Sequence, residues 1–146
     1  MINGVILTPL KSIFSEGGNV FHGIKSSDSG YKKFSEAYFT TIDYLAIKPW
    51  KKHNQMTLNL IVIHGEIQFV VYDDRNDSPS YKLIEHFTLG PENNYARLTV
   101  PPGLYVAFQG LSKQKNIALN VADIIHEPSE IDRKNLNFIT YSWRQK

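Results

Sequence analysis

The sequence predicts an all-β fold, either a sandwich or a barrel, on two observations. Clusters of Gly, Pro, Asn and Asp recur roughly every dozen residues, as expected for turns between short strands. The segments between them are rich in β-branched and aromatic residues. We expect strands over residues 19–24, 36–42, 58–64, 66–72, 82–88, 96–100, 104–110 and 117–123, and a short helix or 3₁₀ turn near 128–134, where Pro and acidic residues favour a helix start.

The alternation is clearest in 66–72, where Ile67, Phe69 and Val71 share one face of the predicted strand. Gly65, between this strand and the preceding one, permits the positive φ of a tight turn. These two segments therefore predict a hairpin, and sheets built from such hairpins are antiparallel.

Residues 50–67, WKKHNQMTLNLIVIHGEI, change from polar to apolar. If 51–63 were one extended strand, alternate side chains would share a face. The polar face would hold Lys51, His53, Gln55, Thr57 and Asn59. The opposite face would hold Met56, Leu58, Leu60 and Val62. The pattern alone allows either a solvent-facing strand or a barrel mouth lined by polar groups.

Composition limits the class of protein. A chain of 146 residues suits a single domain, 1–146, and 42% hydrophobic with 21% charged residues is ordinary for a globular protein. A net charge of +2 with scattered Lys and Arg argues against nucleic-acid binding. The absence of cysteine excludes disulfides and thiolate metal sites. Without a basic leader or an apolar run near the ~20 residues that span a bilayer, we expect a cytoplasmic protein that binds no membrane.

Four blocks in order carry a family resemblance: GVILTPL, the long FSEAYFTTIDYLAIKPWKKHNQMTLNLIVIHGEIQFVVYDDR, LTVPPGLYVAFQGL, and NVADIIHEPSEIDR. Together they cover roughly residues 3–143, and they resemble the cupin-fold dTDP-4-dehydrorhamnose 3,5-epimerases and the related dTDP-sugar ketoisomerases. The resemblance implies a double-stranded β-helix, or jelly-roll, barrel that forms a homodimer. It also implies a nucleotide-linked 4-keto-6-deoxy sugar as substrate, and a role in polysaccharide biosynthesis.

The resemblance also implies that the protein works without a metal or another cofactor. The spacing of the first metal-binding motif of cupins falls on Lys51, His53, Leu58 and Gly65, and the histidine of the second motif falls on Val106. One imidazole does not make a stable site, because such sites need three or four convergent ligands. We therefore expect that His53 binds no metal.

The same resemblance assigns catalytic roles. It makes His53 the base that removes a proton next to the sugar ketone, a step suited to the pKa of imidazole. Lys51 is then placed to stabilise the enolate, and Tyr38 to act as the acid or to orient the sugar. Lys48 falls on a family arginine and is expected to bind phosphate.

Two further substrate-binding candidates come from the pattern of the strands. Asn59 belongs to the polar row of His53. Tyr105 follows the PPG turn on the face opposite Phe108, and we expect one of these two aromatic rings to face the barrel cavity.

Three departures from the epimerase pattern keep two functions open. Gly17 stands where epimerases have an arginine that holds the diphosphate, Leu119 where they have the acid tyrosine, and Trp50 where they have another arginine. The leading hypothesis is a metal-independent sugar-nucleotide epimerase or ketoisomerase. The alternative is a non-catalytic cupin that binds a sugar nucleotide or carbohydrate.

Overall fold

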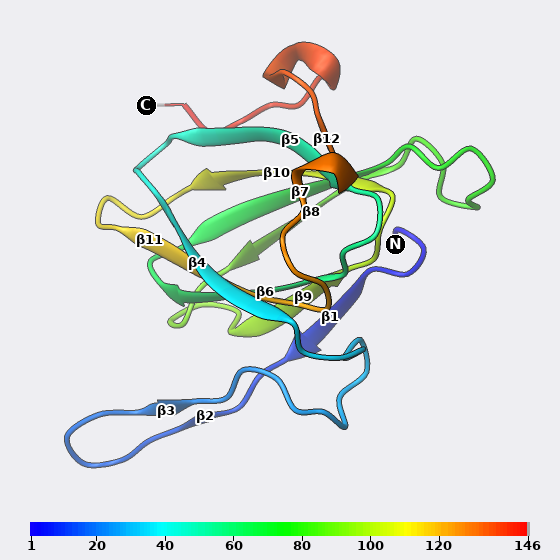
Figure 1. The fold of residues 1–146 in the computed structure, drawn as a ribbon. Helices are drawn as coiled ribbons and strands as arrows, with labels where there is room; N and C mark the ends of the chain where they lie inside the picture. Colours follow the sequence, from blue (N-terminus) through cyan, green and yellow to red (C-terminus); the bar gives the residue numbers. More distant parts are fainter. Residues whose placement is uncertain (146) are drawn as a thin grey trace.

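A computed structural model describes residues 1–145 as two five-stranded antiparallel sheets that face each other as a barrel (Figure 1). In spatial order the first sheet contains β1 (Ile6–Pro9), β9 (Ala96–Val100), β6 (Leu58–His64), β11 (Asn116–Ala122) and β4 (Glu36–Ile42). The second contains β12 (Ile131–Arg133), β5 (Ile47–His53), β10 (Leu104–Gly110), β7 (Ile67–Asp73) and β8 (Ile84–Leu89). This arrangement confirms the predicted all-β cupin, or jelly-roll, fold.

Three smaller elements lie outside the sheets. The hairpin of β2 (Ser12–Ile13) and β3 (Val20–Phe21) projects from the barrel as an arm (Figure 1). Two 3₁₀ turns, η1 (Pro128–Glu130) and η2 (Leu136–Phe138), flank β12 near the carboxyl end. The expected helix near 128–134 is therefore only one turn long. It gives way to β12, because residues 131–133 pair with the edge of β5.

Inward side chains of both sheets form one apolar core. Leu60 and Val62 of β6 pack in the same cluster as Phe69 and Val71 of β7, and all four are buried. The alternation that predicted these strands thus places their apolar faces against each other. The predicted hairpin is wrong, because β6 and β7 lie in different sheets and do not pair with each other. The predicted strands 36–42, 58–64, 96–100 and 104–110 have the observed bounds, whereas 66–72, 82–88 and 117–123 each differ by one or two residues. Of the predicted strand 19–24, only Val20–Phe21 is a strand.

The expectation of one extended strand over 51–63 is wrong. β5 ends at His53, the chain turns through residues 54–57, and β6 begins at Leu58 in the opposite sheet. The turn is stabilised by η1, because the backbone N–H of Asn54 donates to the carbonyl of Glu130. The bend breaks the alternation, so His53 and Leu58 both face the interior while Asn59 does not.

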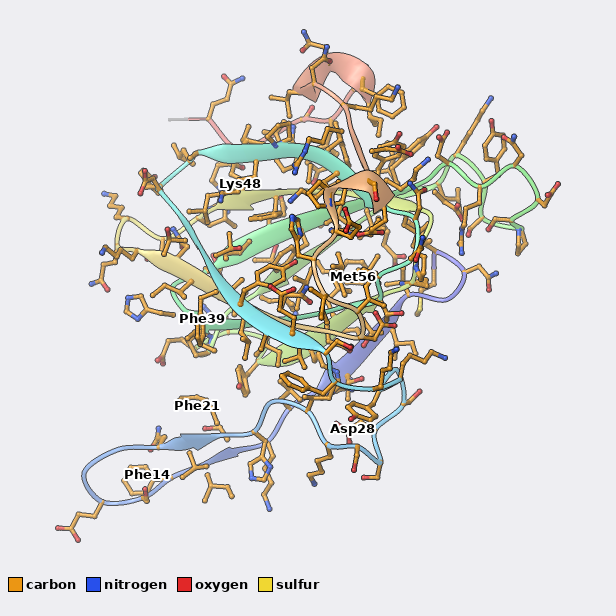
Figure 2. The ribbon with its side chains drawn as sticks, in the orientation of Figure 1. Phe14, Phe21, Asp28, Phe39, Lys48 and Met56 are labelled. Carbon is orange, nitrogen blue, oxygen red and sulfur yellow. The ribbon has the colours of Figure 1, made fainter. Side chains whose placement is uncertain are left out.

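The segment from residue 22 to 30 covers part of the outer face of the first sheet, where Arg97 holds it (Figure 2). The guanidinium of Arg97 is fully buried. It donates to the carbonyls of Gly23 and Ser29 and pairs with Asp28 at 2.8 Å. Arg97, a charged residue on the outer face of the first sheet, is thereby buried and hydrogen-bonded rather than exposed to solvent.

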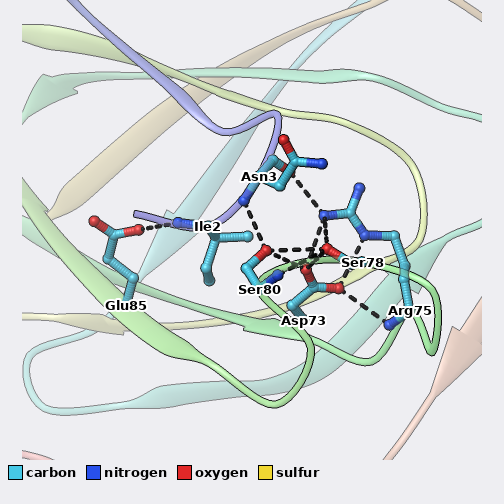
Figure 3. A network of polar contacts seen from close by, with 7 residues as sticks. All are labelled: Ile2, Asn3, Asp73, Arg75, Ser78, Ser80 and Glu85. Carbon is cyan, nitrogen blue, oxygen red and sulfur yellow. Dashed lines mark hydrogen bonds and ion pairs between the residues drawn. The ribbon is translucent and has the colours of Figure 1, made fainter.

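A second network fixes the amino end of the chain against the second sheet (Figure 3). The buried carboxylate of Asp73 accepts hydrogen bonds from Arg75, Ser78 and Ser80. These bonds overcome burial and hold the pKa of Asp73 far below its usual range. Ser80 and Arg75 in turn bind the backbone N–H and C=O of Asn3. The network therefore lets Ile2 pack into the core.

Replacement of Arg97 by Ala should destabilise the fold by about 2–4 kcal/mol, because a large buried side chain is lost and several carbonyl groups lose their donor. Urea unfolding measures the loss, and proteolysis should become faster within residues 22–30. Lys113→Ala, at an exposed loop position, is the control. A change below about 0.5 kcal/mol, typical of surface substitutions, would contradict the anchoring role of Arg97.

Candidate active site

A β-bulge in β5 turns two lysines to the same side. Along the β5–β10 pairing, Val106 is opposite Lys51 and Phe108 is opposite Lys48. Three steps along β5 therefore match two steps along β10, and β5 carries one extra residue. Since cross-strand partners share a face, Lys48 and Lys51 both face the interior with Val106 and Phe108.

The bulge lies between Lys48 and Lys51, at Pro49 and Trp50, and both of these residues suit a bulge. Pro49 has no N–H to donate to a ladder. The indole of Trp50 is buried outside the barrel, beside Trp143, and its Nε1 donates to the carbonyl of Leu136. The carboxyl-terminal segment thus holds the bulge from outside, which fixes the direction of the two lysines inside.

The barrel encloses a cavity of about 310 Å³ between the two sheets. Part of its wall is apolar, and its polar groups come from β4, β5, β11, β12 and the residue that follows β12. The lining residues are Tyr38, Thr40, Lys48, Pro49, Trp50, Lys51, His53, Leu58, Leu60, Phe69, Val106, Phe108, Ala118, Asn120, Arg133 and Lys134. An apolar cavity of this size with a few convergent polar groups is typical of a small-molecule site.

Positive charge gathers at the mouth of the cavity. Lys48, Arg133 and Lys134 are exposed there, and Lys51 lies half-buried deeper in. Burial, and then the positive charges of Arg133 and Lys48, lower the pKa of Lys51 below its usual value. Among residues 1–145, no Asp or Glu side chain lines the cavity. The electrostatic environment therefore favours an anionic ligand.

His53 and Glu130 form a buried dyad behind these cations. His53 is 5% exposed, and its Nδ1 hydrogen-bonds the Oε1 of Glu130. The other carboxylate oxygen accepts the backbone N–H groups of Gln55 and Met56, at 2.9 and 3.4 Å. Glu130 is thus bound by three donors and holds the imidazole in one orientation.

The protonation state of the dyad follows from its surroundings. Burial lowers the pKa of His53, more than Glu130 raises it. Burial raises the pKa of Glu130, but the hydrogen bonds from His53, Gln55 and Met56 bring it below its usual value. At neutral pH the pair is a carboxylate and a neutral imidazole whose Nδ1–H donates to Glu130. The lone pair of Nε2 is then free to accept a proton.

Tyr38 of β4 lines the cavity beside Asn120 of β11. Its hydroxyl accepts a hydrogen bond from the Asn120 amide at 3.0 Å and lies 3.9 Å from the sulfur of Met56. The cavity thus contains a neutral imidazole, an ammonium group and a phenol. Together these groups can remove a proton, stabilise the negative charge that results, and return a proton.

The structure brings together four of the six residues that the sequence singled out: Tyr38, Lys48, Lys51 and His53. Asn59 lies elsewhere, since it is buried against Thr99 on the outer face of β6. Tyr105 also points outward, where the ammonium of Lys52 lies 4.9 Å from its ring centre. Phe108, the other aromatic candidate of β10, lines the cavity instead.

Sequence reasoning missed Glu130, Asn120, Arg133 and Lys134. Glu130 lies 77 residues from His53, and the only signal was its place in the PSEID segment. Asn120 could have been found from strand parity, because it and Ala118 face inward. Leu119, the residue aligned with the family's acid tyrosine, pairs with exposed Phe39 and is not among the residues that line the cavity. A substrate contact from this strand would have to come from Ala118 or Asn120.

Across residues 1–145, no group of three His, Cys, Asp or Glu side chains is placed to hold a metal ion. The same residues include no helix long and apolar enough to cross a membrane. His53 also uses its Nδ1 on Glu130. The donor set around the cavity therefore does not fit the metal centre of metal-dependent cupins.

The barrel, its cationic cavity and its histidine–carboxylate dyad define a cupin-fold protein with a site for a small anionic ligand. A scan against protein-family models finds no match. The dTDP-sugar isomerase of Desulfovibrio desulfuricans is 33% identical, and the match covers 97% of this chain and 92% of that one at a TM-score of 0.93. The chain therefore belongs to the dTDP-sugar isomerase family.

More distant relatives share the fold. A dTDP-6-deoxy-D-glucose-3,5-epimerase of Legionella pneumophila, in complex with dTDP-4-keto-L-rhamnose, is 17% identical with a TM-score of 0.79, over 90% of this chain and 73% of that one. A probable low-salt glycan biosynthesis epimerase of Haloferax volcanii is 21% identical over 94% of this chain and 88% of that protein. At these identities the structural likeness shows the fold alone.

The dyad should make the stability of the protein depend on pH in a set direction. The folded-state pKa values of His53 and Glu130 both lie below their ordinary values of 6.5 and 4.5. The unfolded chain therefore binds more protons, and the free energy of unfolding should fall as pH drops from about 6.5. Urea unfolding between about pH 7.5 and pH 4, a range that includes both ordinary pKa values, measures it.

In His53→Gln the part of this fall that begins near the histidine's ordinary pKa should disappear, because the titrating group is gone while an amide can still donate to Glu130. The same substitution at exposed His64 is the control. Equal pH dependence in the wild type and His53→Gln would show that His53 is not buried in its neutral form.

Proposed function

We propose that the protein is a metal-independent isomerase or epimerase of a nucleotide-linked 4-keto-6-deoxy sugar. The observation that carries the proposal is the buried His53–Glu130 dyad at the wall of a cationic cavity. Membership in the dTDP-sugar isomerase family and the nucleotide-sugar ligand of the Legionella relative support the substrate class. A role in glycan biosynthesis agrees with the name of the archaeal relative.

In the proposed reaction, Nε2 of His53 takes the proton from the carbon next to the sugar ketone. The C–H electron pair forms the enolate, and the ketone oxygen becomes negatively charged. The ammonium of Lys51 stabilises that oxygen, while Glu130 stabilises the imidazolium that forms. Return of a proton to the same carbon from the opposite side gives the epimer. A proton shift that re-forms the carbonyl at the neighbouring carbon gives the ketoisomer.

The diphosphate of the substrate is expected at the mouth of the cavity. Lys48, Arg133 and Lys134 are exposed there, so their charges remain available to phosphate oxygens. Gly17 stands where the family has an arginine that holds the diphosphate. The mouth of the cavity can still bind phosphate without that arginine, because these three cations are present. Gly17 lies in the exposed turn of the arm, away from the residues that line the cavity.

The alternative, a cupin that binds a sugar nucleotide without turning it over, has less support. A binding module needs the cationic mouth and the apolar wall. It has no need for an imidazole that burial keeps neutral and that a carboxylate with three donors holds in one orientation. Such an arrangement is typical of a general base, whose pKa and orientation are set by its neighbours.

Solvent exchange tests the proposal directly. In D₂O, the protein should introduce deuterium next to the ketone of a nucleotide-linked 4-keto-6-deoxy sugar, as followed by NMR over a panel of nucleotides. His53→Ala should lower the rate by about 10²–10⁴-fold, because a positioned base is lost. The fold should persist, since no apolar core residue is removed.

His53→Gln shows whether hydrogen bonding alone can substitute, and His64→Ala, at an exposed position outside the cavity, is the control. Exchange at the wild-type rate in His53→Ala would exclude His53 as the base. Binding of the nucleotide sugars without any exchange in the wild type would support the non-catalytic alternative.

We further propose that two copies of the chain associate through the arm and the outer face of the first sheet. Phe14 and Phe21 of the arm are 86% and 42% exposed, and Phe39 of β4 is 64% exposed (Figure 2). Exposed aromatic rings on a projecting hairpin beside an edge strand are unfavourable in water, and a symmetric partner would cover both. A cytoplasmic homodimer is the assembly that we expect.

Replacement of both Phe14 and Phe21 by Ser should convert the dimer to a monomer, as measured by light scattering at micromolar concentration. Phe21 packs on Tyr95 at 5.2 Å between ring centres, but neither Phe14 nor Phe21 belongs to the apolar core, so the monomer should stay folded. Phe34→Ser, which removes an exposed phenylalanine outside the arm, is the control. A wild-type protein that is monomeric at this concentration would contradict the proposed assembly.

A further inference from the structure

The hydroxyl of Tyr38 is held by one side chain whose role neither the family resemblance nor the strand pattern assigns. The amide nitrogen of Asn120 donates to the Tyr38 oxygen at 3.0 Å. The two residues are directly opposite each other in the β4–β11 pairing, and both line the cavity. Asn120 is 3% exposed, so its amide is held away from water.

The orientation of the Asn120 amide is fixed by the backbone. Its Oδ1 accepts the N–H of Asn59 at 2.9 Å. A backbone N–H can only donate, so the oxygen must face Asn59 and the nitrogen must face Tyr38. The strand ladder of β6 and β11 thus makes Asn120 a donor toward the phenol rather than an acceptor.

Among residues 1–145, the proton of Tyr38 has no strong acceptor. Its hydroxyl lies 3.9 Å from the sulfur of Met56, and a thioether is a weak acceptor. The amide N–H of Asn120 occupies a lone pair of the phenol oxygen, which leaves the O–H bond free to turn toward the cavity. The arrangement therefore presents a proton to a ligand instead of to a neighbouring side chain.

The same contact favours the phenolate that remains after proton transfer. Burial raises the pKa of Tyr38, and the hydrogen bond from Asn120 opposes that rise. Nearby negative charge on Glu36 and Glu130 also raises it. Among residues 1–145, Asn120 is the one side chain that donates a hydrogen bond to the Tyr38 oxygen. This hydrogen bond stabilises the deprotonated form of Tyr38.

We propose that Asn120 is a positioning residue that holds the Tyr38 hydroxyl as the proton donor to the substrate. The inference rests on the proposed function, and it assigns the acid of that reaction. When the enolate collapses, the O–H bond of Tyr38 breaks and its proton goes to the substrate. The electron pair stays on the phenolate oxygen, which keeps the hydrogen bond from the N–H of Asn120. After product release, solvent returns a proton to Tyr38 and takes the proton that His53 holds.

The first test measures the ionisation of Tyr38 in the protein without substrate. The absorbance of phenolate is followed against pH, and the same curve for Tyr38→Phe is subtracted to isolate Tyr38. In Asn120→Asp the carboxylate still accepts the N–H of Asn59, but it would accept the Tyr38 proton instead of donating. The pKa of Tyr38 should rise by about one to two units, the size of one hydrogen bond to a charged group.

Asn120→Ala provides a neutral variant that removes the donor without adding charge, and the pKa of Tyr38 should rise in it as well. Asn116→Asp is the matched control, because Asn116 is a buried asparagine of the same strand that accepts backbone N–H groups outside the cavity. An unchanged Tyr38 titration in folded Asn120→Asp and Asn120→Ala, or an equal shift in Asn116→Asp, would overturn the proposal.

The second test separates this inference from the proposed function. For the substrate that the exchange panel identifies, Asn120→Ala should lower kcat by about 10–100-fold with KM changed less than about threefold, because the acid is displaced rather than the substrate. A loss confined to KM would make Asn120 a binding residue and overturn the positioning role. If the wild type exchanges no proton, the proposed function fails, while the titration still decides whether Asn120 controls Tyr38.

Discussion

The carboxylate of Glu130 is the contact on which both the bend of the barrel and its chemistry depend. It binds the imidazole of His53 and the backbone N–H groups of Gln55 and Met56, where the chain crosses from one sheet to the other. Without an acceptor, the two buried donors, the imidazole of His53 and the N–H of Met56, would each cost about 1–3 kcal/mol. A single buried side chain thus stabilises the turn and fixes the tautomer of His53, the proposed base.

Positive charge inside the barrel is the second constraint. The bulge at Pro49 and Trp50 turns Lys48 and Lys51 toward the same space, where Arg133 is also placed. Like charges so close together disfavour one another, and burial adds to the cost at Lys51. An anionic substrate offsets that repulsion when it binds. The site is therefore less stable when empty, a usual feature of sites arranged for charged ligands.

The sequence predicted most strands because their alternation reflects burial on one face, which is a local property. Ile67, Phe69 and Val71 alternate in the sequence and lie together in the core. The interpretation of 51–63 as one strand was wrong because a turn through residues 54–57 interrupts the row of polar residues. Asn59 therefore lies on the outer face of β6, where it is buried against Thr99.

The site was predicted less completely because it depends on long-range pairing. The resemblance indicated His53, Lys51, Lys48 and Tyr38, and the structure brings these four together. Glu130 and Arg133 reach the site only because β12 pairs with the edge of β5. Nothing in the PSEIDR segment itself indicates that pairing. The bulge that aligns Lys48 with Lys51 likewise becomes visible only when β5 is paired with β10.

The central claim is that a neutral His53, held by Glu130, removes the proton of the substrate. The most direct measurement is the pH dependence of the rate of solvent-deuterium exchange, set beside the NMR titration of the His53 imidazole. Because burial lowers the pKa of His53, exchange should remain fast below the ordinary histidine pKa of 6.5. It should then fall with the midpoint of the His53 titration. An acid limb that does not coincide with that titration, or that is unchanged in Glu130→Gln, would contradict the account.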